Sequence, residues 1–474
     1  MKIFKNFFRL LLIPVLVLSG CGNDNHGLSK NNPQSITVWN YYNGALAIEF
    51  DQLVTEFNNT IGRENGIVVY AESMSTVPDL ENALRDSAHE KVGSAKMPNI
   101  FQCYPDMAVE LNEIVPLVNF DDYVSEKDRK KYLSSYITTG CIGENNEWKI
   151  FPIAQSTEVL MLNKTDWDKF ASQTGATTDD LATWEGIAST AKKYYEWTGG
   201  KAFFGRDAFA NYPIVGSAQL GHEIFNVKNG EVTLDFDKDV MRRLWDNFYV
   251  PYINGYYTQV GNYRSDDVKI GEIISFVCST SSSIYFPTEV SVSDDVTYPI
   301  DYMILPLPNF EGAPPYEVQQ GAGMAVCKST EAEEYASVLF LQWFTNKEQN
   351  LRFSLSSGYL PVTNEALEVK TFTDFFDDTH SKQLIVDALN VALEQTKKYT
   401  PYATQGFING SQARSILNTS MIDKAIEDRN LLNERVSKGE DREKVLNEYT
   451  SDTNFDSWYQ NTFNELKQIC KDGK

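Results

Sequence analysis

QQGAGMAVCKSTEAEEYASVLFLQWFTNKEQNLRFSLSSGYLPV, residues 319–362, is the stretch of the sequence that decides the fold. Two closely spaced glycines, Gly321 and Gly323, precede a short apolar run at 324–327, which predicts a turn followed by a strand. From about residue 332 to 344 apolar residues recur at helical spacing, so a helix with a broad apolar face is expected next. A compact strand–helix unit therefore lies far from both ends of the sequence. The fold must also include the long segments that precede and follow it.

The length and composition of the chain restrict the class of protein to which it can belong. At 474 residues it is too long for one ordinary core, which favours two lobes of roughly 200 residues each. With 42% hydrophobic and 13% aromatic residues the chain can build folded cores, which excludes a disordered protein. A formal net charge of -23 cannot neutralise phosphates, so we expect no nucleic-acid partner. It is typical of a soluble secreted protein kept dispersed by self-repulsion.

The N-terminus predicts export. Basic residues within 1–9 precede an apolar run at 10–18 that is far shorter than the ~20 residues of a membrane-spanning helix, so residues 1–21 read as a signal peptide. The ending Leu-Ser-Gly-Cys resembles a bacterial lipobox, in which Cys21 becomes the lipidated N-terminus and anchors the protein at the extracellular face of the cell membrane. A plain secretory signal with a chance cysteine is the alternative. The polar residues 22–35 indicate a flexible tether.

The remaining cysteines do not indicate a metal site. Cys103, Cys278 and Cys327 each end an apolar run, where a cysteine behaves as a small buried hydrophobe. The chain has four histidines, none of them near a cysteine, and no C-x-x-C spacing, so we expect no metal and no cofactor. A disulfide cannot be read from these positions.

The first part of the mature chain alternates strands and helices. Strands are expected at 35–39, 67–70 and 99–103, with helices at about 45–58 and 79–90 between them. This alternation predicts an α/β domain with a parallel sheet. Ligands of such sheets bind at the carboxyl ends of the strands, which places two segments at the rim of one cleft: Trp39 to Asn43 and Tyr104 to Asp106.

Three further segments are interpreted as crossings between two lobes. The run 151–164 is apolar and extended in its second half and carries Ser156 and Thr157. A return crossing is expected at 302–306 and a third near 359–362. For Ser156 and Thr157 the alternative is a buried strand whose hydroxyls bond to its own backbone.

The order of these motifs resembles a known family. The segments 35–57, 151–164, 183–185 and 321–362 together are similar to the extracellular solute-binding proteins, family 1, of bacterial ABC importers, the carbohydrate-type group. The resemblance implies a two-lobed, type II periplasmic-binding-protein-like α/β fold with a hinge of crossover strands and a helical C-terminal region. It places an N-terminal lobe at 36–152 and 306–358 and a C-terminal lobe at 153–305 and 359–474.

The resemblance also implies a mechanism and partners. Two lobes close around a small-molecule ligand, and the closed form docks on ABC permease subunits that work with an ATPase. For a sugar ligand, aromatic rings would stack on C–H faces while hydroxyl, amide, carboxylate and backbone groups bond its hydroxyls. The serine-rich run after residue 278 would suit polar or anionic groups at a helix start. We expect a monomer.

The candidate ligand-binding residues come from the rims and crossings described above, and core packing is the alternative for every aromatic among them. They are Trp39, Tyr41, Tyr42, Asn43, Tyr104, Asp106, Ser156, Thr157, Phe209, Tyr212, Ser279, Ser281, Gly321, Gly323, Tyr359 and Asn409.

No catalytic motif stands out, so we expect no catalytic residue and no enzyme. A carbohydrate, in particular an oligosaccharide, is the favoured ligand. The loop at 403–411 is similar to one in glycerol-3-phosphate-binding relatives, which supports glycerol-3-phosphate or a glycerophosphodiester as the alternative, although Gly406 stands where those relatives carry an arginine. A two-carboxylate glycosidase and a surface adhesin are the alternatives from other classes.

Overall fold

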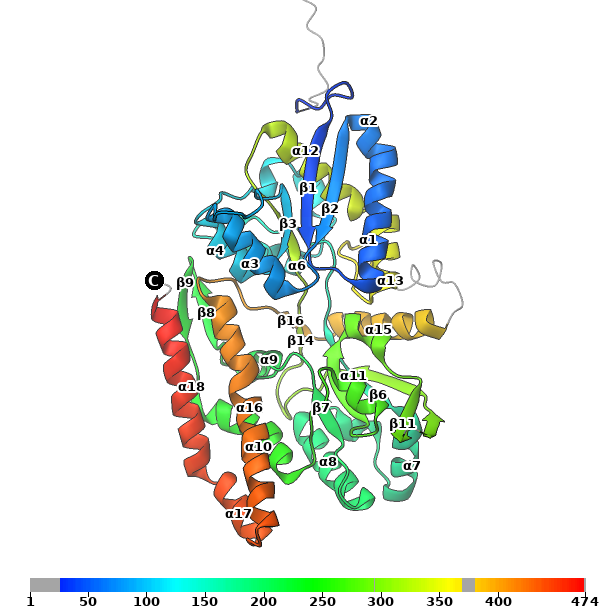
Figure 1. Ribbon diagram of the computed structural model, residues 1–474, viewed down its shortest axis with the longest axis vertical. Coiled ribbons are helices and arrows are strands. Elements are labelled where there is room, and N and C mark those ends of the chain that lie inside the picture. The colour runs from blue at the N-terminus through cyan, green and yellow to red at the C-terminus, as the bar shows by residue number, and fades with distance from the viewer. Residues whose placement is uncertain (1–25, 294, 369–379, 473–474) are drawn as a thin grey trace, which may run out of the picture.

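The computed structural model describes residues 26–293, 295–368 and 380–472. The chain folds into two lobes, one above the other in Figure 1, with a long helical region at its C-terminus. This arrangement confirms the predicted two-lobed α/β fold class. The predicted signal peptide, Cys21 and the first residues of the predicted tether lie outside the described ranges.

The first lobe is built on a mixed sheet with the strand order β15-β3-β1-β2. β1 runs parallel to β2 and β3, whereas β15 is antiparallel to β3, so the predicted parallel sheet carries one antiparallel edge strand. β15 is the strand predicted after the glycine turn, and its position is confirmed to within one residue. The strands are β1 (Gln34–Asn40), β2 (Ile67–Ser73), β3 (Ile100–Cys103) and β15 (Gly323–Val326).

Helices cover both faces of this sheet (Figure 1). The predicted helix after β15 is confirmed as α12, which begins at a capping box in which the Thr330 hydroxyl accepts from the Glu333 N–H and the Glu333 carboxylate accepts from the Thr330 N–H. Phe340 of α12 packs on Phe57 of α1, with ring centroids 5.1 Å apart. The main helices are α1 (Gly44–Phe57), α3 (Val77–Ala88), α4 (Pro105–Asn112), α12 (Glu331–Phe344) and α13 (Lys347–Ser357).

The second lobe has its own sheet in the order β13-β6-β10-β7. Every residue of β6 is buried, because β10 and β13 flank it on both edges and helices cover its faces. The strands are β6 (Glu158–Asn163), β7 (Phe204–Arg206), β10 (Ser275–Ser279) and β13 (Tyr302–Pro306). The helices used below are α8 (Trp184–Thr198), α9 (Asn211–Gln219), α10 (Lys238–Asn254), α11 (Arg264–Lys269), α15 (His380–Thr396), α16 (Gly410–Ser437) and α18 (Asp452–Asp472).

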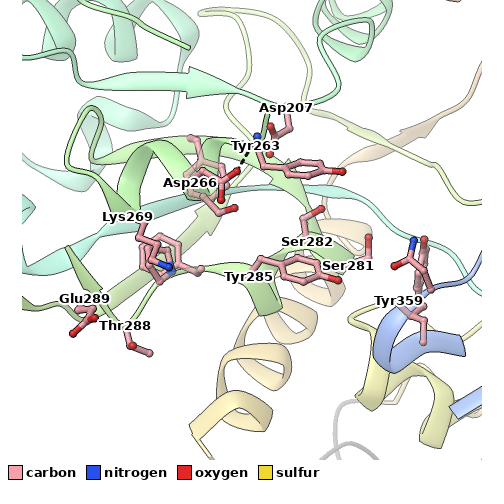
Figure 2. Close-up of a pocket in the computed structure, with 16 residues that line it drawn as sticks. Asp207, Tyr263, Asp266, Lys269, Ser281, Ser282, Tyr285, Thr288, Glu289 and Tyr359 are labelled. Carbon is pink, nitrogen blue, oxygen red and sulfur yellow. Dashed lines mark hydrogen bonds between the residues drawn. The ribbon is translucent and has the colours of Figure 1, made fainter. Parts of the chain in front are cut away.

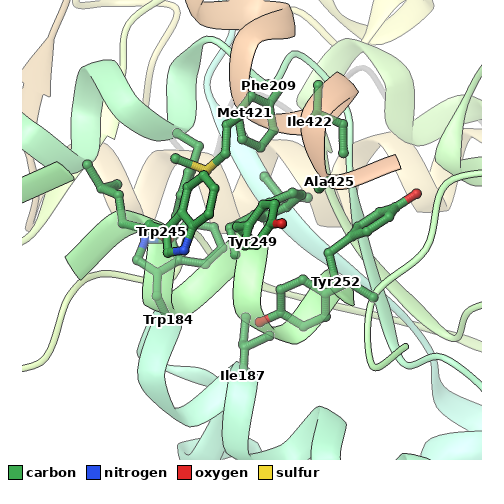
Figure 3. Packing of buried hydrophobic residues seen from close by; sticks show 14 of the residues in the cluster. Trp184, Ile187, Phe209, Trp245, Tyr249, Tyr252, Met421, Ile422 and Ala425 are labelled. Atoms are coloured by element: carbon green, nitrogen blue, oxygen red, sulfur yellow. The ribbon is translucent and has the colours of Figure 1, made fainter. Parts of the chain in front are cut away.

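An aromatic core joins the C-terminal helices to the second lobe (Figure 3). Trp245 and Tyr249 of α10 stack with ring centroids 3.5 Å apart, and Met421 of α16 belongs to the same buried cluster. The C-terminal helices therefore complete the second lobe rather than forming a separate domain.

The two lobes are connected where backbone segments lie side by side. Phe151 pairs with Met324, Ser156 pairs with Gln320, and Gln155 pairs with Leu360. The chain thus passes between the lobes near residues 151–156 and 319–323. The third crossing predicted near 359–362 requires a correction, because Val362 packs in the first-lobe core and Thr363 pairs with Tyr132. The chain is still in the first lobe at residue 364, whose N–H donates to the Lys131 carbonyl.

The predicted return crossing at Tyr302–Pro306 requires a correction. These residues are β13, which pairs along its whole length with β6 inside the second sheet. Leu307, Phe310 and Val318 also belong to the core of the second lobe. The chain therefore leaves the second lobe only near Gln319, after β14 (Tyr316–Val318) has paired with β16 (Thr400–Tyr402).

The cysteines at 103, 141, 278 and 327 are buried free thiols, and Cys470 is buried as well. No helix within the described residues is long and apolar enough to cross a membrane.

A carboxylate is buried beside the return crossing. Glu317 of β14 is 3% exposed, and its Oε2 accepts from Gln395 Nε2 at 3.3 Å and from Thr396 Oγ1 at 3.4 Å. Among the described residues no cation lies within ion-pair distance of it. Burial raises the pKa of Glu317 to about 7.

We predict that Glu317→Gln stabilises the protein at pH 8 and has little effect at pH 5. Because the pKa of Glu317 is higher in the folded state than in the unfolded state, its contribution to stability is lost as pH rises from about 4.5 to about 7. Above that window the charged group costs up to about 3 kcal/mol, which the neutral amide avoids. Calorimetric melting temperatures at both pH values check this, with the exposed Glu144→Gln as control. An equal change at pH 5 and pH 8 would contradict the prediction.

Candidate functional site

A cavity of about 840 Å³ lies between the two lobes, beside Tyr359 (Figure 2). The first lobe contributes Asn43 and Leu46 from the start of α1, and Tyr359 from the segment after α13. The remaining lining belongs to the second lobe: Asp207, Tyr263, Ser265, Asp266, Lys269, Phe276, Ser281, Ser282, Tyr285, Phe286, Pro287, Thr288 and Glu289. The cavity therefore contacts both lobes, although unequally.

Two tyrosine rings stand exposed in this cavity. Tyr263 is 66% exposed and Tyr285 is 59% exposed, whereas most aromatic residues of the chain are buried. Tyr263 precedes α11, and Tyr285 ends a short 3-10 helix at Thr280–Tyr285. An aromatic ring offers a large apolar face next to a polar hydroxyl, so exposed rings inside a cavity indicate contact with a ligand.

The polar groups of the cavity are positioned by local backbone structure. Ser279 caps the 3-10 helix by accepting from the Ser281 N–H at 3.3 Å, and its hydroxyl lies 2.9 Å from that of Ser281. Asp207 accepts from the Arg264 N–H at 3.2 Å, and burial raises its pKa to about 6. Arg264 is itself buried in an ion pair with Asp267. Serine hydroxyls and a carboxylate thus face the cavity on a fixed backbone.

A tyrosine cluster, Tyr41, Tyr104 and Tyr359, lies next to the cavity. The three hydroxyls lie close enough to influence one another's ionisation, and Ser281 of the second lobe lies near that of Tyr359. Burial raises the pKa of Tyr359 to about 12 and that of Tyr41 well above its ordinary value. These two hydroxyls therefore stay neutral at physiological pH and can both donate and accept.

The structure brings some predicted residues to this site. Asn43, Ser281 and Tyr359 line the cavity, Tyr41 and Tyr104 join Tyr359 in the cluster, and Ser279 positions Ser281. Sequence reasoning missed Tyr263, Tyr285 and Asp207. Tyr285 follows the predicted serine-rich run, which is a weak signal, whereas nothing in the sequence distinguishes Tyr263.

Four predicted aromatic contacts require a correction, because the structure places their side chains in hydrophobic cores. Trp39 and Tyr42 pack within the first lobe, and Phe209 and Tyr212 pack within the second. The Tyr212 hydroxyl donates to the Leu244 carbonyl at 3.0 Å, so its polar end is satisfied internally. None of the four belongs to the cavity lining.

The predicted residues of the crossings serve packing. Ser156 pairs through its backbone with Gln320, and the Thr157 hydroxyl accepts from Gln395 Nε2 at 3.1 Å. Gly321 has φ +129°, and a Cβ there would lie 2.8 Å from the Ala154 carbonyl oxygen. A Cβ at Gly323 would lie 2.5 Å from the Ile150 side chain. These positions shape the hinge rather than the cavity wall.

Asp106 and Asn409 lie where the lobes touch each other, away from the cavity lining. The Asp106 carboxylate accepts from the Phe407 N–H at 3.2 Å. Asn409, with φ +66°, precedes α16. In this structure Asp106 makes an interlobe contact and Asn409 stands at a helix start.

A buried ion pair supports the second-lobe side of the site. Arg206 of β7 pairs with Glu158 of β6, and both side chains are almost fully buried. Asn211 donates to Glu158 at 2.7 Å and to Gln320 of the return crossing at 3.0 Å. The guanidinium also lies over the Trp184 ring, 5.4 Å from its centroid. This network joins the second sheet to the hinge.

The fold and the interlobe cavity together define a two-lobed binding protein for a small solute. The sequence matches the bacterial extracellular solute-binding protein family over residues 52–380, and the chain belongs to that family. Members of this family bind small-molecule solutes and work with ABC transporters. A search of curated protein sequences gave no match.

Solved structures with the same fold bind several solutes. The cyclic α-maltosyl-1,6-maltose binding protein of Arthrobacter globiformis is 16% identical, with a TM-score of 0.68 over 93% of this chain and 100% of its own. The substrate-binding protein Lmo0181 of Listeria monocytogenes, in complex with cycloalternan, is 16% identical, with a TM-score of 0.65 over 92% and 99%. UgpB of Mycobacterium tuberculosis, in complex with glycerophosphocholine, is 18% identical, with a TM-score of 0.64 over 92% and 99%. At these identities the likeness establishes the fold.

We predict that Arg206→Met lowers the free energy of unfolding by about 3–5 kcal/mol, because Glu158 would remain buried without its cation. The double variant Glu158→Gln/Arg206→Met should lose less, since the amide can still bond to Asn211. Urea denaturation measures both. Lys130→Met, which breaks an exposed pair with Glu126, is the control and should cost less than about 1 kcal/mol. An Arg206→Met loss no larger than this control would refute the prediction.

Proposed function

We propose that this protein captures an oligosaccharide in the interlobe cavity and delivers it to the permease of an ABC importer. Lipidation of Cys21 would hold it at the extracellular face of the cell membrane as a monomer. The observation that carries the proposal is the pair of exposed rings, Tyr263 and Tyr285, in a cavity that both lobes line. The function is capture and release, without a catalytic residue.

The chemistry of the lining supports a sugar. Sugar rings combine apolar C–H faces with a periphery of hydroxyl groups. Tyr263, Tyr285 and Tyr359 can cover such faces, while Ser281, Asp207 and neighbouring polar groups can bond hydroxyls. A volume of about 840 Å³ lies within the range of ordinary ligand pockets and has room for more than one sugar unit.

Closure follows from the distribution of contacts. A ligand that touches Asn43 in one lobe and Ser281 in the other gains affinity only when both are near, so it favours the closed arrangement. We place the hinge at the crossings, with one lobe formed by residues 36–152 and 320–364 and the other by 153–319 and 380–472. This modifies the sequence-based division at the return crossing and at the third crossing.

A glycerophosphodiester is the second candidate. The glycerophosphocholine complex of UgpB supports it, as does Lys269 in the cavity wall. Among the described lining residues, however, Lys269 is the one lysine or arginine beside three carboxylates, Asp207, Asp266 and Glu289. This balance disfavours an anionic ligand.

A thermal-shift screen of residues 22–474 decides between these candidates. The panel contains mono- and oligosaccharides, glycerol-3-phosphate and glycerophosphocholine. A ligand at 100 times its Kd should add about 2.7 kcal/mol of stability. A shift with saccharides alone supports the proposal, whereas a shift with the phosphates alone overturns it. Release of reducing sugar from a glycan would indicate a glycosidase, and the absence of any shift would favour an adhesin.

We predict that Tyr285→Ala and Tyr359→Ala each weaken binding of the saccharide that gives the largest shift by about tenfold or more, because each removes a ring from the cavity wall. Isothermal titration calorimetry measures the Kd. Tyr70→Ala is the matched control, since Tyr70 is 58% exposed on β2 and outside the cavity lining. Equal affinities for wild type and both cavity variants would argue that the saccharide binds elsewhere.

A further inference from the structure

Residues 403–410, here called the latch loop, lie directly on the first turn of α4. A Cβ at Gly406 would be 2.5 Å from the backbone carbon and oxygen of Pro105. A Cβ at Gly410 would be 2.0 Å from Asp106 Oδ1. Neither glycine has a positive φ, so close approach of the two lobes, and not backbone conformation, requires glycine at both positions.

The latch loop is fixed to the second lobe. The Phe407 side chain is 1% exposed and packs against Phe225 with ring centroids 5.1 Å apart. The preceding β16 pairs with β14, and the following α16 packs on α10. Because both ends and the central side chain are anchored, the loop is expected to move with its lobe.

The first lobe meets the loop with a carboxylate. Asp106 Oδ1 accepts from the Phe407 N–H at 3.2 Å. Burial raises the pKa of Asp106 to about 7, against the opposing effects of that hydrogen bond and of Arg414 on α16, while Glu81 on α3 raises it further. The contact exists only while the lobes are together, since its two sides belong to different lobes.

The latch contact and the cavity lie on opposite sides of the crossings. In Figure 1, α4 and the beginning of α16 lie to the left of β14 and β16, whereas the start of α1 and α11 lie to the right. No residue of the latch loop and no residue from 104 to 106 belongs to the described cavity lining. Tyr104, which adjoins Pro105, is a neighbour of Tyr41 and Tyr359, and of these three residues Tyr359 lines the cavity.

We propose that Asp106, Gly406 and Gly410 form an interlobe latch that holds the lobes together without ligand and so sets the separation of the cavity walls. They are positioning residues for capture, because they act on the ligand through the tyrosine cluster and the lobe spacing. The consequence for the cavity rests on the proposed function, whereas the latch itself does not.

Small-angle X-ray scattering of the ligand-free protein tests the latch. Gly406→Ala and Gly410→Ala should each increase the radius of gyration, because the added methyl group overlaps the other lobe. Alanine is favoured over glycine within a helix, so Gly410→Ala should not unfold α16. Circular dichroism confirms folding, and Ser411→Ala, the next residue of the same helix, should scatter like the wild type.

Rescue by a second substitution separates the latch from a general loss of structure. Asp106→Ala should restore the compact form of Gly410→Ala, because it removes the overlapping carboxylate while the contact of Gly406 with the Pro105 backbone remains. It should not restore Gly406→Ala, whose overlap is with the Pro105 backbone. An unchanged radius of gyration in both glycine variants, or rescue of both by Asp106→Ala, overturns the proposal.

Affinity provides a second readout. If the screen identifies a saccharide, Gly406→Ala should bind it more weakly, since a smaller fraction of molecules has the cavity walls at the right spacing. An unchanged Kd in a variant that scatters as an open form would contradict the positioning role. If no saccharide binds, the proposed function fails while the scattering experiment still decides the latch.

Discussion

The close contact of backbone segments between the lobes is the constraint on which the rest of the structure depends. Gln155 donates through its N–H to the Leu360 carbonyl at 3.0 Å, and Ser156 donates to that of Gln320 at 2.6 Å. β6 begins two residues after Ser156, and β15 begins three residues after Gln320. Both sheets are therefore aligned by the crossings, and the cavity beside Tyr359 takes its shape from them. Gly321 is required because no side chain fits between the paired segments.

Much of the fold could be predicted because it depends on local patterns. The strand at Gly323–Val326 and the helix at Glu331–Phe344 were predicted from a glycine turn, an apolar run and apolar residues at helical spacing within a few dozen residues. Local patterns alone could not decide whether Tyr302–Pro306 is a crossing between the lobes. An extended apolar strand looks the same whether it pairs with β6 or passes between lobes, and only the long-range partner distinguishes the two.

The candidate site was predicted less well for a related physical reason. Tyr41 and Tyr42 are neighbours after β1, but side chains alternate in extended chain, so Tyr41 joins the tyrosine cluster while Tyr42 enters the core. The sequence identifies an aromatic rim without stating which ring faces the cleft. Tyr263 and Tyr285 come from a loop and a short 3-10 helix, which have no periodicity to reveal a buried or exposed side.

The buried carboxylates differ in whether a cation accompanies them. Glu158 is neutralised by Arg206 inside the second lobe, whereas Glu317 and Asp106 lie at the junction with no ion pair among the described residues and with raised pKa values. A buried carboxylate without a cation is costly, and separation of the lobes would return Asp106 to water, because its partner Phe407 belongs to the other lobe. Asp106 thus holds the lobes together through its hydrogen bond to the Phe407 N–H, while its charged form weakens that closure, so the closed form is not excessively stable. Because most of the cavity lining belongs to the second lobe, a ligand can bind there first and then supply, through Asn43 and Tyr359, the contacts that favour closure.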